Sequence, residues 1–233
     1  MTTSYANPYT VAADAAPSDR AAFMRSTYIH LGLAILAFIG VEWYLLQQEW
    51  ALSLVEKMLG FGWLIVLGLF MAVSWVADKL ARSDTSKGVQ YAGLGLFIVA
   101  QAFVFLPLML FAAMKSQDGM IFVKAGTTTA FIFAGLTAAA FATRKDFSFL
   151  RSFLVIGSFI AFGIILVSIL FGFSLGTIFA GAMAIFASVA ILYSTSNIIH
   201  HYRTDQSVSA ALSLFSSVAL LFFYILQIFM SRD

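Results

Sequence analysis

The sequence predicts an all-α, polytopic membrane protein folded as a bundle of seven transmembrane helices. Hydrophobic residues make up 61% of the 233 residues and charged residues only 10%. In a globular domain roughly half of the residues are hydrophobic and roughly a quarter are charged. The apolar residues form continuous runs of about 20 residues, the length that crosses a bilayer core of about 30 Å. The runs also lack the period-two alternation of barrel strands. Helices are therefore expected, because they satisfy their own backbone hydrogen bonds in lipid.

Seven such runs follow one another along the chain. They are Tyr28–Leu46, Gly60–Ala77, Val89–Met114, Ile121–Ala142, Phe149–Phe171, Leu175–Ser196 and Ser207–Met230. The first run is too long for the core of a cleaved signal peptide, and more spans follow it. Residues 1–27 are rich in Ala, Ser, Thr and Asp and are predicted to be a mobile cytoplasmic tail. Residues 28–230 are predicted to be a single transmembrane domain.

Basic residues in the connecting segments predict the orientation of the bundle. Nine lysines and arginines fall on one side of the predicted membrane and four on the other. The larger group is Arg20, Arg25, Lys79, Arg82, Lys87, Arg144, Lys145, Arg151 and Arg203; the smaller is Lys57, Lys115, Lys124 and Arg232. Because cytoplasmic loops carry the excess of positive residues, the N-terminus is predicted inside and the C-terminus outside. The compact form and short loops favour a bacterial inner (plasma) membrane.

Several classes of function are disfavoured by the composition. The formal net charge is only +2, and no basic run with interleaved aromatic residues is present, so a nucleic-acid partner is not expected. The absence of cysteine excludes disulfides, thiol nucleophiles and cysteine-ligated metals. No nucleotide-binding loop, nucleophile elbow or zinc-protease motif occurs. We therefore expect neither an enzyme nor a bound cofactor, with the lipid bilayer as the main partner.

One acidic residue, Glu42, lies inside the first run, nearer its predicted outer end. Ionisable groups at membrane depth are costly and are candidates for function. Trp43 and Tyr44 follow it, a pair typical of the membrane interface. The favoured interpretation is an interfacial position, and the alternative is a role in a pore or in ion coordination.

The most polar stretch of the second half, Ile191–Gln206, contains His200, His201 and Asp205. Adjacent residues on a helix point about 100° apart, so both histidines would not easily bind one metal, and a zinc site needs three or four ligands. The histidines titrate near neutral pH, so pH sensing is a second hypothesis. The favoured interpretation is a solvated loop between two spans.

Hydroxyl side chains mark the last two runs. Ser209, Ser213 and Ser217 recur every four residues and share one face of the last helix. Ser194 and Asn197 lie in or directly after the sixth run. Small polar residues let membrane helices approach closely and bond to each other, so helix packing is the favoured interpretation. The alternative is that these faces line a narrow polar path.

Two segments resemble the Bax inhibitor-1 family, also called the transmembrane Bax inhibitor motif family, in its bacterial form. "TRKDFSFL" (Thr143–Leu150) resembles the family's loop between the fourth and fifth spans. "ILYSTSNI", with the polar loop after it and Ala211–Phe229, resembles its final pair of helices. The resemblance implies a bundle whose last helix is surrounded by the others. It also implies, from bacterial members, a pH-sensitive calcium leak closed by two aspartates that share a proton.

The positions of those aspartates fall at Ser194 and Ser217, and an arginine frequent near the end of the last helix falls at Gln227. Neutral groups therefore replace both acids and the base. Ser194, Asn197, Ser213, Ser217 and Gln227 are the candidate pore or sensor positions. The first functional hypothesis is a leak channel for calcium or another cation without the titrating switch. The second is a non-conducting membrane protein that modulates a membrane-bound protease or a stress response.

Overall fold

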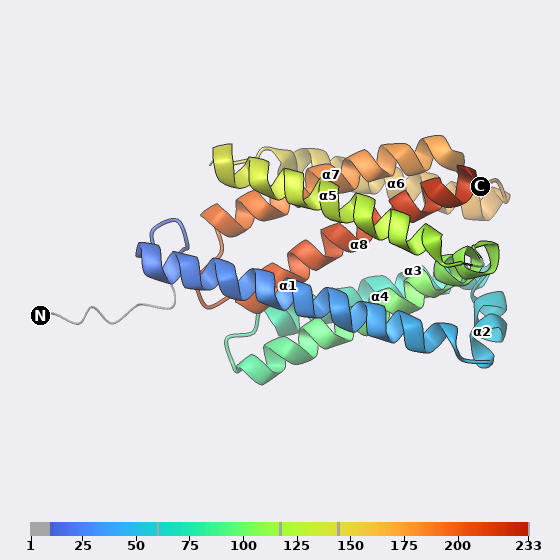
Figure 1. The fold of residues 1–233 in the computed structure, drawn as a ribbon, viewed down its shortest axis with the longest axis horizontal. Coiled ribbons are helices and arrows are strands. Elements are labelled where there is room, and N and C mark those ends of the chain that lie inside the picture. The colour runs from blue at the N-terminus through green and yellow to red at the C-terminus, as the bar shows by residue number, and fades with distance from the viewer. Residues whose placement is uncertain (1–9, 60, 117, 144, 233) are drawn as a thin grey trace, which may run out of the picture.

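A computed structural model describes residues 10–59, 61–116, 118–143 and 145–232. Within these residues the chain forms eight helices (Figure 1). They are α1 (Pro17–Leu46), α2 (Trp50–Met58), α3 (Phe61–Ala81), α4 (Lys87–Lys115), α5 (Met120–Thr143), α6 (Leu150–Phe171), α7 (Gly176–His200) and α8 (Ser207–Arg232). Seven of the eight are long and apolar enough to cross a membrane, which confirms the predicted all-α, seven-span fold.

The start of the first span is the largest error in the predicted boundaries. Helix α1 begins at Pro17 rather than Tyr28, because proline is well suited to the first helical turn. The segment before the helix is also attached to the bundle: the Ala12 amide donates to the Tyr202 carbonyl at 2.8 Å, and Arg20 Nε donates to the Ala12 carbonyl at 2.7 Å. The predicted tail of residues 1–27 therefore extends too far, and residues 1–9 lie outside the described part of the chain.

The short helix α2 was not predicted. Its nine residues are too few to cross a bilayer, and it lies at the end of the bundle where α1 ends (Figure 1). Ala51, Val55 and Met58 are buried and share one face by their spacing of four and three residues. An amphipathic connection of this kind carries no long hydropathy signal.

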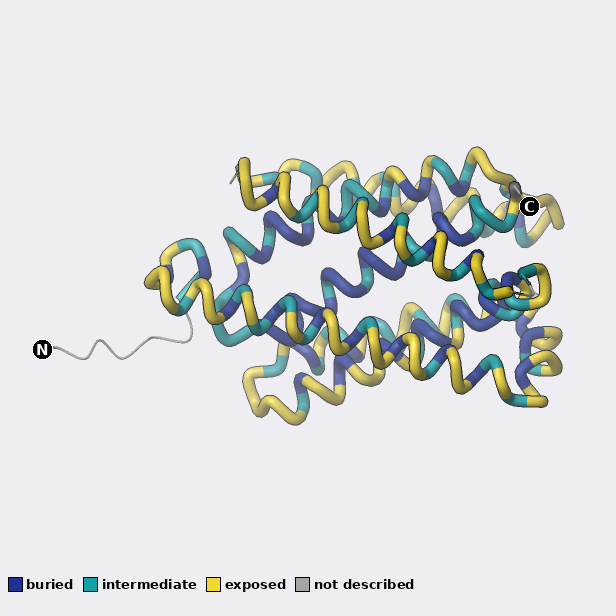
Figure 2. The backbone as a smooth tube through the Cα atoms, viewed as in Figure 1, coloured by how far each residue is buried: buried dark blue, intermediate teal, exposed yellow. Residues whose placement is uncertain are grey.

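Helix α8 lies at the centre of the bundle. It packs against α7, α1, α5 and α4, and it runs between these helices in Figure 1. Over half (56%) of its most apolar window is buried, against 11% for α3 and for α6, and Figure 2 shows the contrast between the buried central helix and the exposed outer faces. Ala210 and Ala211 are fully buried in α8, because small side chains let neighbouring helices approach closely.

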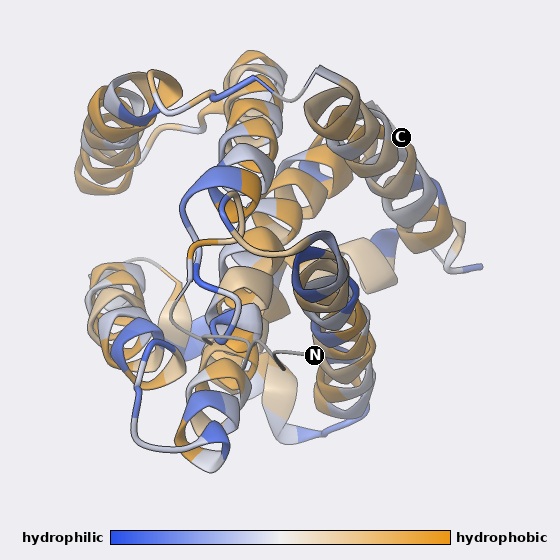
Figure 3. Ribbon diagram, turned by 90° about the vertical axis from the view of Figure 1, so that its left-hand side faces the viewer, coloured by the Kyte–Doolittle hydropathy of each residue, from blue (hydrophilic) through white to orange (hydrophobic). Residues whose placement is uncertain are grey.

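The polar loops gather at the two ends of the bundle. Figure 3 looks onto one end and shows hydrophilic residues in the loops and hydrophobic residues along the helices. Lys87 Nζ donates to the Asp205 carbonyl at 2.7 Å, and Lys115 Nζ donates to the Met230 carbonyl at 2.5 Å. Loops predicted on the same side of the membrane thus lie together. Which end faces the cytoplasm stays a prediction.

Candidate functional site: a serine cluster between α7 and α8

Three serines meet where α7 crosses α8. The hydroxyl oxygens of Ser194 and Ser217 lie 3.1 Å apart in a buried hydrogen bond. Ser213 Oγ donates to Ser194 Oγ at 3.4 Å, and Ser217 Oγ donates to the Ser213 carbonyl at 3.1 Å. The two positions that the family resemblance pairs are therefore in direct contact across two helices.

The surroundings of the cluster are apolar. Ile191 and Ile198 on α7 and Leu214 and Leu221 on α8 are completely or almost completely buried. Their spacing places them on the faces that carry the serines into the helix contact. Hydroxyl groups have no charge to gain or lose near neutral pH. The cluster can hold the helices together and offer oxygen atoms to a cation, but it lacks the carboxylates that calcium prefers.

The remaining candidates from the sequence lie apart from this contact. Asn197 is half-buried one turn after Ser194, and its backbone carbonyl accepts bonds from His201 and Tyr202. Gln227 lies ten residues after Ser217 on α8, or about 15 Å along the axis at 1.5 Å per residue. Its buried Oε1 has no hydrogen-bond partner among the described residues. Gln227 is thus not part of the serine cluster.

Ser196, which was not among the predicted site residues, connects the family-like loop to α7. Its hydroxyl accepts a bond from the Phe147 amide at 2.8 Å and donates to the Lys145 carbonyl at 3.3 Å. The side chain is almost fully buried. The loop between α5 and α6 is therefore fixed to the helix that carries Ser194. The sequence shows a serine two residues after Ser194. It does not show that this serine bonds to a loop about 50 residues away.

The two histidines have different environments. His200 is the last residue of α7 rather than part of a loop, and its buried Nε2 has no hydrogen-bond partner in the described structure. His201 Nε2 lies 3.6 Å from Asp146 Oδ2. Bonds from the side chain and the amide of Ser148 hold the pKa of the Asp146 carboxyl below its ordinary value. No group of three metal-ligating acidic or histidine side chains occurs among the described residues.

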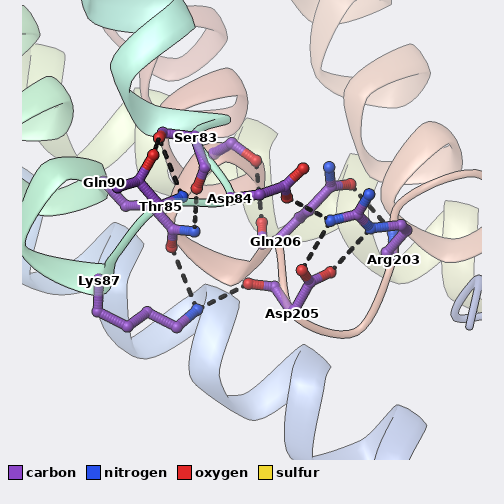
Figure 4. A network of polar contacts seen from close by, with 9 residues as sticks. Ser83, Asp84, Thr85, Lys87, Gln90, Arg203, Asp205 and Gln206 are labelled. Atoms are coloured by element: carbon purple, nitrogen blue, oxygen red, sulfur yellow. Dashed lines mark hydrogen bonds and ion pairs between the residues drawn. The ribbon is translucent and has the colours of Figure 1, made fainter. Parts of the chain in front are cut away.

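Asp205 belongs to a polar network between two loops at this end of the bundle (Figure 4). Arg203 donates to Asp205 at 2.8 and 3.0 Å and to Asp84 at 2.6 Å. These bonds raise the pKa of the Arg203 guanidinium. Lys87 extends the network from the Asp205 carbonyl to the Gln90 side chain. The network fixes the α7–α8 loop to the α3–α4 loop, which is a structural role for Asp205.

Glu42 is buried inside the bundle, and its predicted interfacial depth in the membrane stays a prediction. The residue is 1% exposed, and neither carboxylate oxygen has a hydrogen-bond partner among the described residues. Trp43 and Tyr44, which follow it, are 68% and 58% exposed, as expected of an interfacial pair. The helix thus directs the two aromatic side chains outward and the carboxylate inward, toward a cavity lined by α1, α4, α5 and α8.

The fold and the serine cluster define a helical membrane protein whose last helix is enclosed by the others. The chain matches the family model described as "Inhibitor of apoptosis-promoting Bax1" over residues 20–233. It is 32% identical to an uncharacterized protein of Pseudomonas aeruginosa, over 88% of this chain and 87% of the relative. It is 30% identical to Bax inhibitor 1 of Schizosaccharomyces pombe, over 94% and 80%, and 29% identical to Protein LIFEGUARD 4 of Arabidopsis thaliana, over 93% and 87%. The chain belongs to the Bax inhibitor-1 family.

Proposed function

We propose that this protein is a cation leak of the Bax inhibitor-1 type, closed by a neutral constriction at Ser194 and Ser217. The observation that carries the proposal is the 3.1 Å contact between the two hydroxyls. They occupy the positions where the family resemblance places a pair of aspartates. A cation would pass when α7 and α8 separate and expose the hydroxyl oxygens. Because serine does not titrate near neutral pH, this constriction adds no pH dependence of its own.

The test is calcium influx into liposomes that contain the purified protein and a calcium indicator. We expect calcium influx above that of empty liposomes. The serine constriction should contribute little change in this influx between about pH 5 and pH 8. A Ser194→Asp, Ser217→Asp double variant should make the influx pH-dependent, because two carboxylates at this separation share one proton. The matched control is Ser194→Ala with Ser217→Ala, which removes the hydroxyls and introduces no charge. Absence of influx with a folded protein refutes the leak.

A second candidate function is that of a non-conducting membrane protein that binds a membrane protease. One observation favours it: the hydroxyls of Ser194, Ser213 and Ser217 bond to each other or to the Ser213 carbonyl, and this network is complete without a cation. This candidate predicts no influx and a stable protease complex. Cross-linking in native membranes, followed by purification of the tagged chain, tests it. Influx without any such complex would refute the second candidate.

A further inference from the structure

An apolar groove opens between α1 and α5 and has Glu42 in its wall. Its floor is formed by α8 and α4, and its volume is about 580 Å³. Residues at its rim are exposed to the surroundings of the bundle: Ile39 is 55% exposed, Val123 57% and Trp43 68%. In a transmembrane bundle these surroundings are lipid. The groove is therefore open toward the bilayer, and lipid molecules reach it laterally.

Polar side chains are rare in the lining of the groove. Glu42 is the only ionisable side chain that lines it within the described structure. Thr129, the other polar side chain, uses its hydroxyl hydrogen for the Ala125 carbonyl at 2.8 Å. The remaining lining residues are aliphatic, aromatic, methionine or glycine. An ionised carboxylate buried without a partner is costly, so a ligand that donates hydrogen bonds to Glu42 would be stabilised there.

A hydrated metal ion does not match these walls. Calcium takes six to eight oxygen ligands, and the groove offers the Glu42 carboxylate and little else. Apolar walls instead suit hydrocarbon. The chemistry that fits both features is an amphiphile with an alkyl chain and a cationic head that carries N–H donors.

The dimensions and depth of the groove fit one lipid of one leaflet. On α1 its lining runs from Ile35 to Leu46, which is about 16 Å of helix, close to half of a hydrocarbon core of about 30 Å. Glu42 lies about one turn before the end of α1. The exposed Trp43 and Tyr44 beside it mark the level of the lipid headgroups. A headgroup at this level reaches Glu42 while its acyl chain follows the groove toward Ile35.

We propose that this groove binds a membrane lipid with a primary ammonium headgroup, of the phosphatidylethanolamine type, whose ammonium pairs with Glu42. The ammonium carries three N–H donors, enough for both unpartnered carboxylate oxygens. A phosphatidylcholine headgroup has a positive charge but no N–H donor. A phosphatidylglycerol headgroup is anionic and is repelled by the carboxylate. This lipid site is separate from the serine cluster and does not depend on ion conduction.

The test is native mass spectrometry of the purified full chain in detergent. The protein is incubated with equal amounts of phosphatidylethanolamine, phosphatidylcholine and phosphatidylglycerol of identical acyl chains. Because a hydrogen bond to a charged group corresponds to roughly a tenfold preference or more, we expect phosphatidylethanolamine to be retained about tenfold over phosphatidylcholine. Glu42→Gln keeps the shape and removes the charge, and it should reduce this preference to about twofold or less. Glu49→Gln, at an exposed position, is the control and should retain it.

A second pair of variants tests the groove itself. Gly126 lines the groove, and a Cβ atom there meets no other atom within 4 Å. Gly126→Leu should therefore fill the groove and reduce retention of phosphatidylethanolamine to the level of phosphatidylcholine. Gly135 on the same helix has equal free space but does not line the groove, so Gly135→Leu should bind as the wild type does.

Three outcomes would overturn the proposal. The first is equal retention of phosphatidylethanolamine and phosphatidylcholine by the wild-type protein. The second is an unchanged preference in Glu42→Gln, and the third is wild-type retention by Gly126→Leu. Thermal melts of all four variants confirm that each one is folded before its lipid binding is compared.

Discussion

The contact between α3 and α4 depends on a glycine, and replacing it by alanine gives a sharp test of the helix packing. A Cβ atom built at Gly93 of α4 would lie 2.6 Å from the Ala77 carbonyl oxygen and 2.6 Å from the Ala81 amide nitrogen of α3. It would also lie 2.9 Å from the Leu80 Cβ atom. Two of these neighbours are backbone atoms, which do not move aside without displacing the helix. Gly93→Ala therefore forces α3 and α4 apart.

The size of the effect follows from two opposing contributions. Ordinary van der Waals contact begins at 3.4 Å, so the helices must separate locally by about 0.8 Å. Overpacking of this kind costs about 1–3 kcal/mol. Alanine recovers about 0.5–1 kcal/mol relative to glycine within a helix. The difference between the two ranges is about 0–2.5 kcal/mol. Because two of the clashing neighbours are backbone atoms, we expect a loss in the upper part of this range, about 1–2 kcal/mol in the free energy of unfolding.

The assay is a thermal melt in detergent, followed by circular dichroism. At about 2–4 °C per kcal/mol for a chain of this size, Gly93→Ala should lower the Tm by roughly 2–8 °C. Gly95→Ala is the matched control on the same helix, because a Cβ atom there meets nothing within 4 Å. It should keep or raise the Tm. If Gly93→Ala melts at the same temperature as Gly95→Ala or above it, the close approach of α3 and α4 is wrong.

Three further predictions concern the core, the serine cluster and one loop. Phe105 is 1% exposed and contacts three other phenylalanine rings, so Phe105→Ala should cost about 3–5 kcal/mol and sharply reduce the folded yield in size-exclusion chromatography. Ser217→Ala removes the bond to Ser194 and should cost about 1 kcal/mol, seen as a small decrease in Tm; an unchanged Tm would contradict the bond. Because the pKa of Asp146 is lowered, protection of the Ser148 amide from hydrogen exchange should persist above the ordinary value of about 4 and be lost as the pH falls through the lowered pKa. Asp146→Asn should abolish this acid dependence.

Only part of the candidate site could be predicted from the sequence. The resemblance in the last two spans predicted that Ser194 and Ser217 hold paired positions, and the structure places their hydroxyls 3.1 Å apart. Gln227 was grouped with them because of its position in the family pattern, yet about three helical turns separate it from Ser217. Spacing within one helix can be calculated from the sequence. The contact between two helices can be inferred only by analogy with a relative.

Glu42 illustrates what the sequence alone could not decide. Its neighbours Trp43 and Tyr44 are typical of the membrane interface, and they are indeed exposed. The direction of the intervening carboxylate depends on how α1 is rotated against α4, α5 and α8, and hydropathy carries little information on rotation when both faces of a helix are apolar. The apolar groove around Glu42 was therefore missed.

The apolar runs of the sequence were enough to identify a seven-span helical membrane protein, because lipid requires about 20 apolar residues for each crossing and internally satisfied backbone hydrogen bonds. The family was also identified from the sequence, through residues Thr143–Leu150 and the last two helices. The resemblance also implied that the last helix is the central one, and the packing of α8 bears this out. The bond by which Ser196 fixes the α5–α6 loop and the apolar groove that Glu42 faces came from the tertiary structure. These features arise from contacts between segments far apart in the chain, and in a uniformly apolar sequence many such contacts satisfy the same hydrophobic pattern.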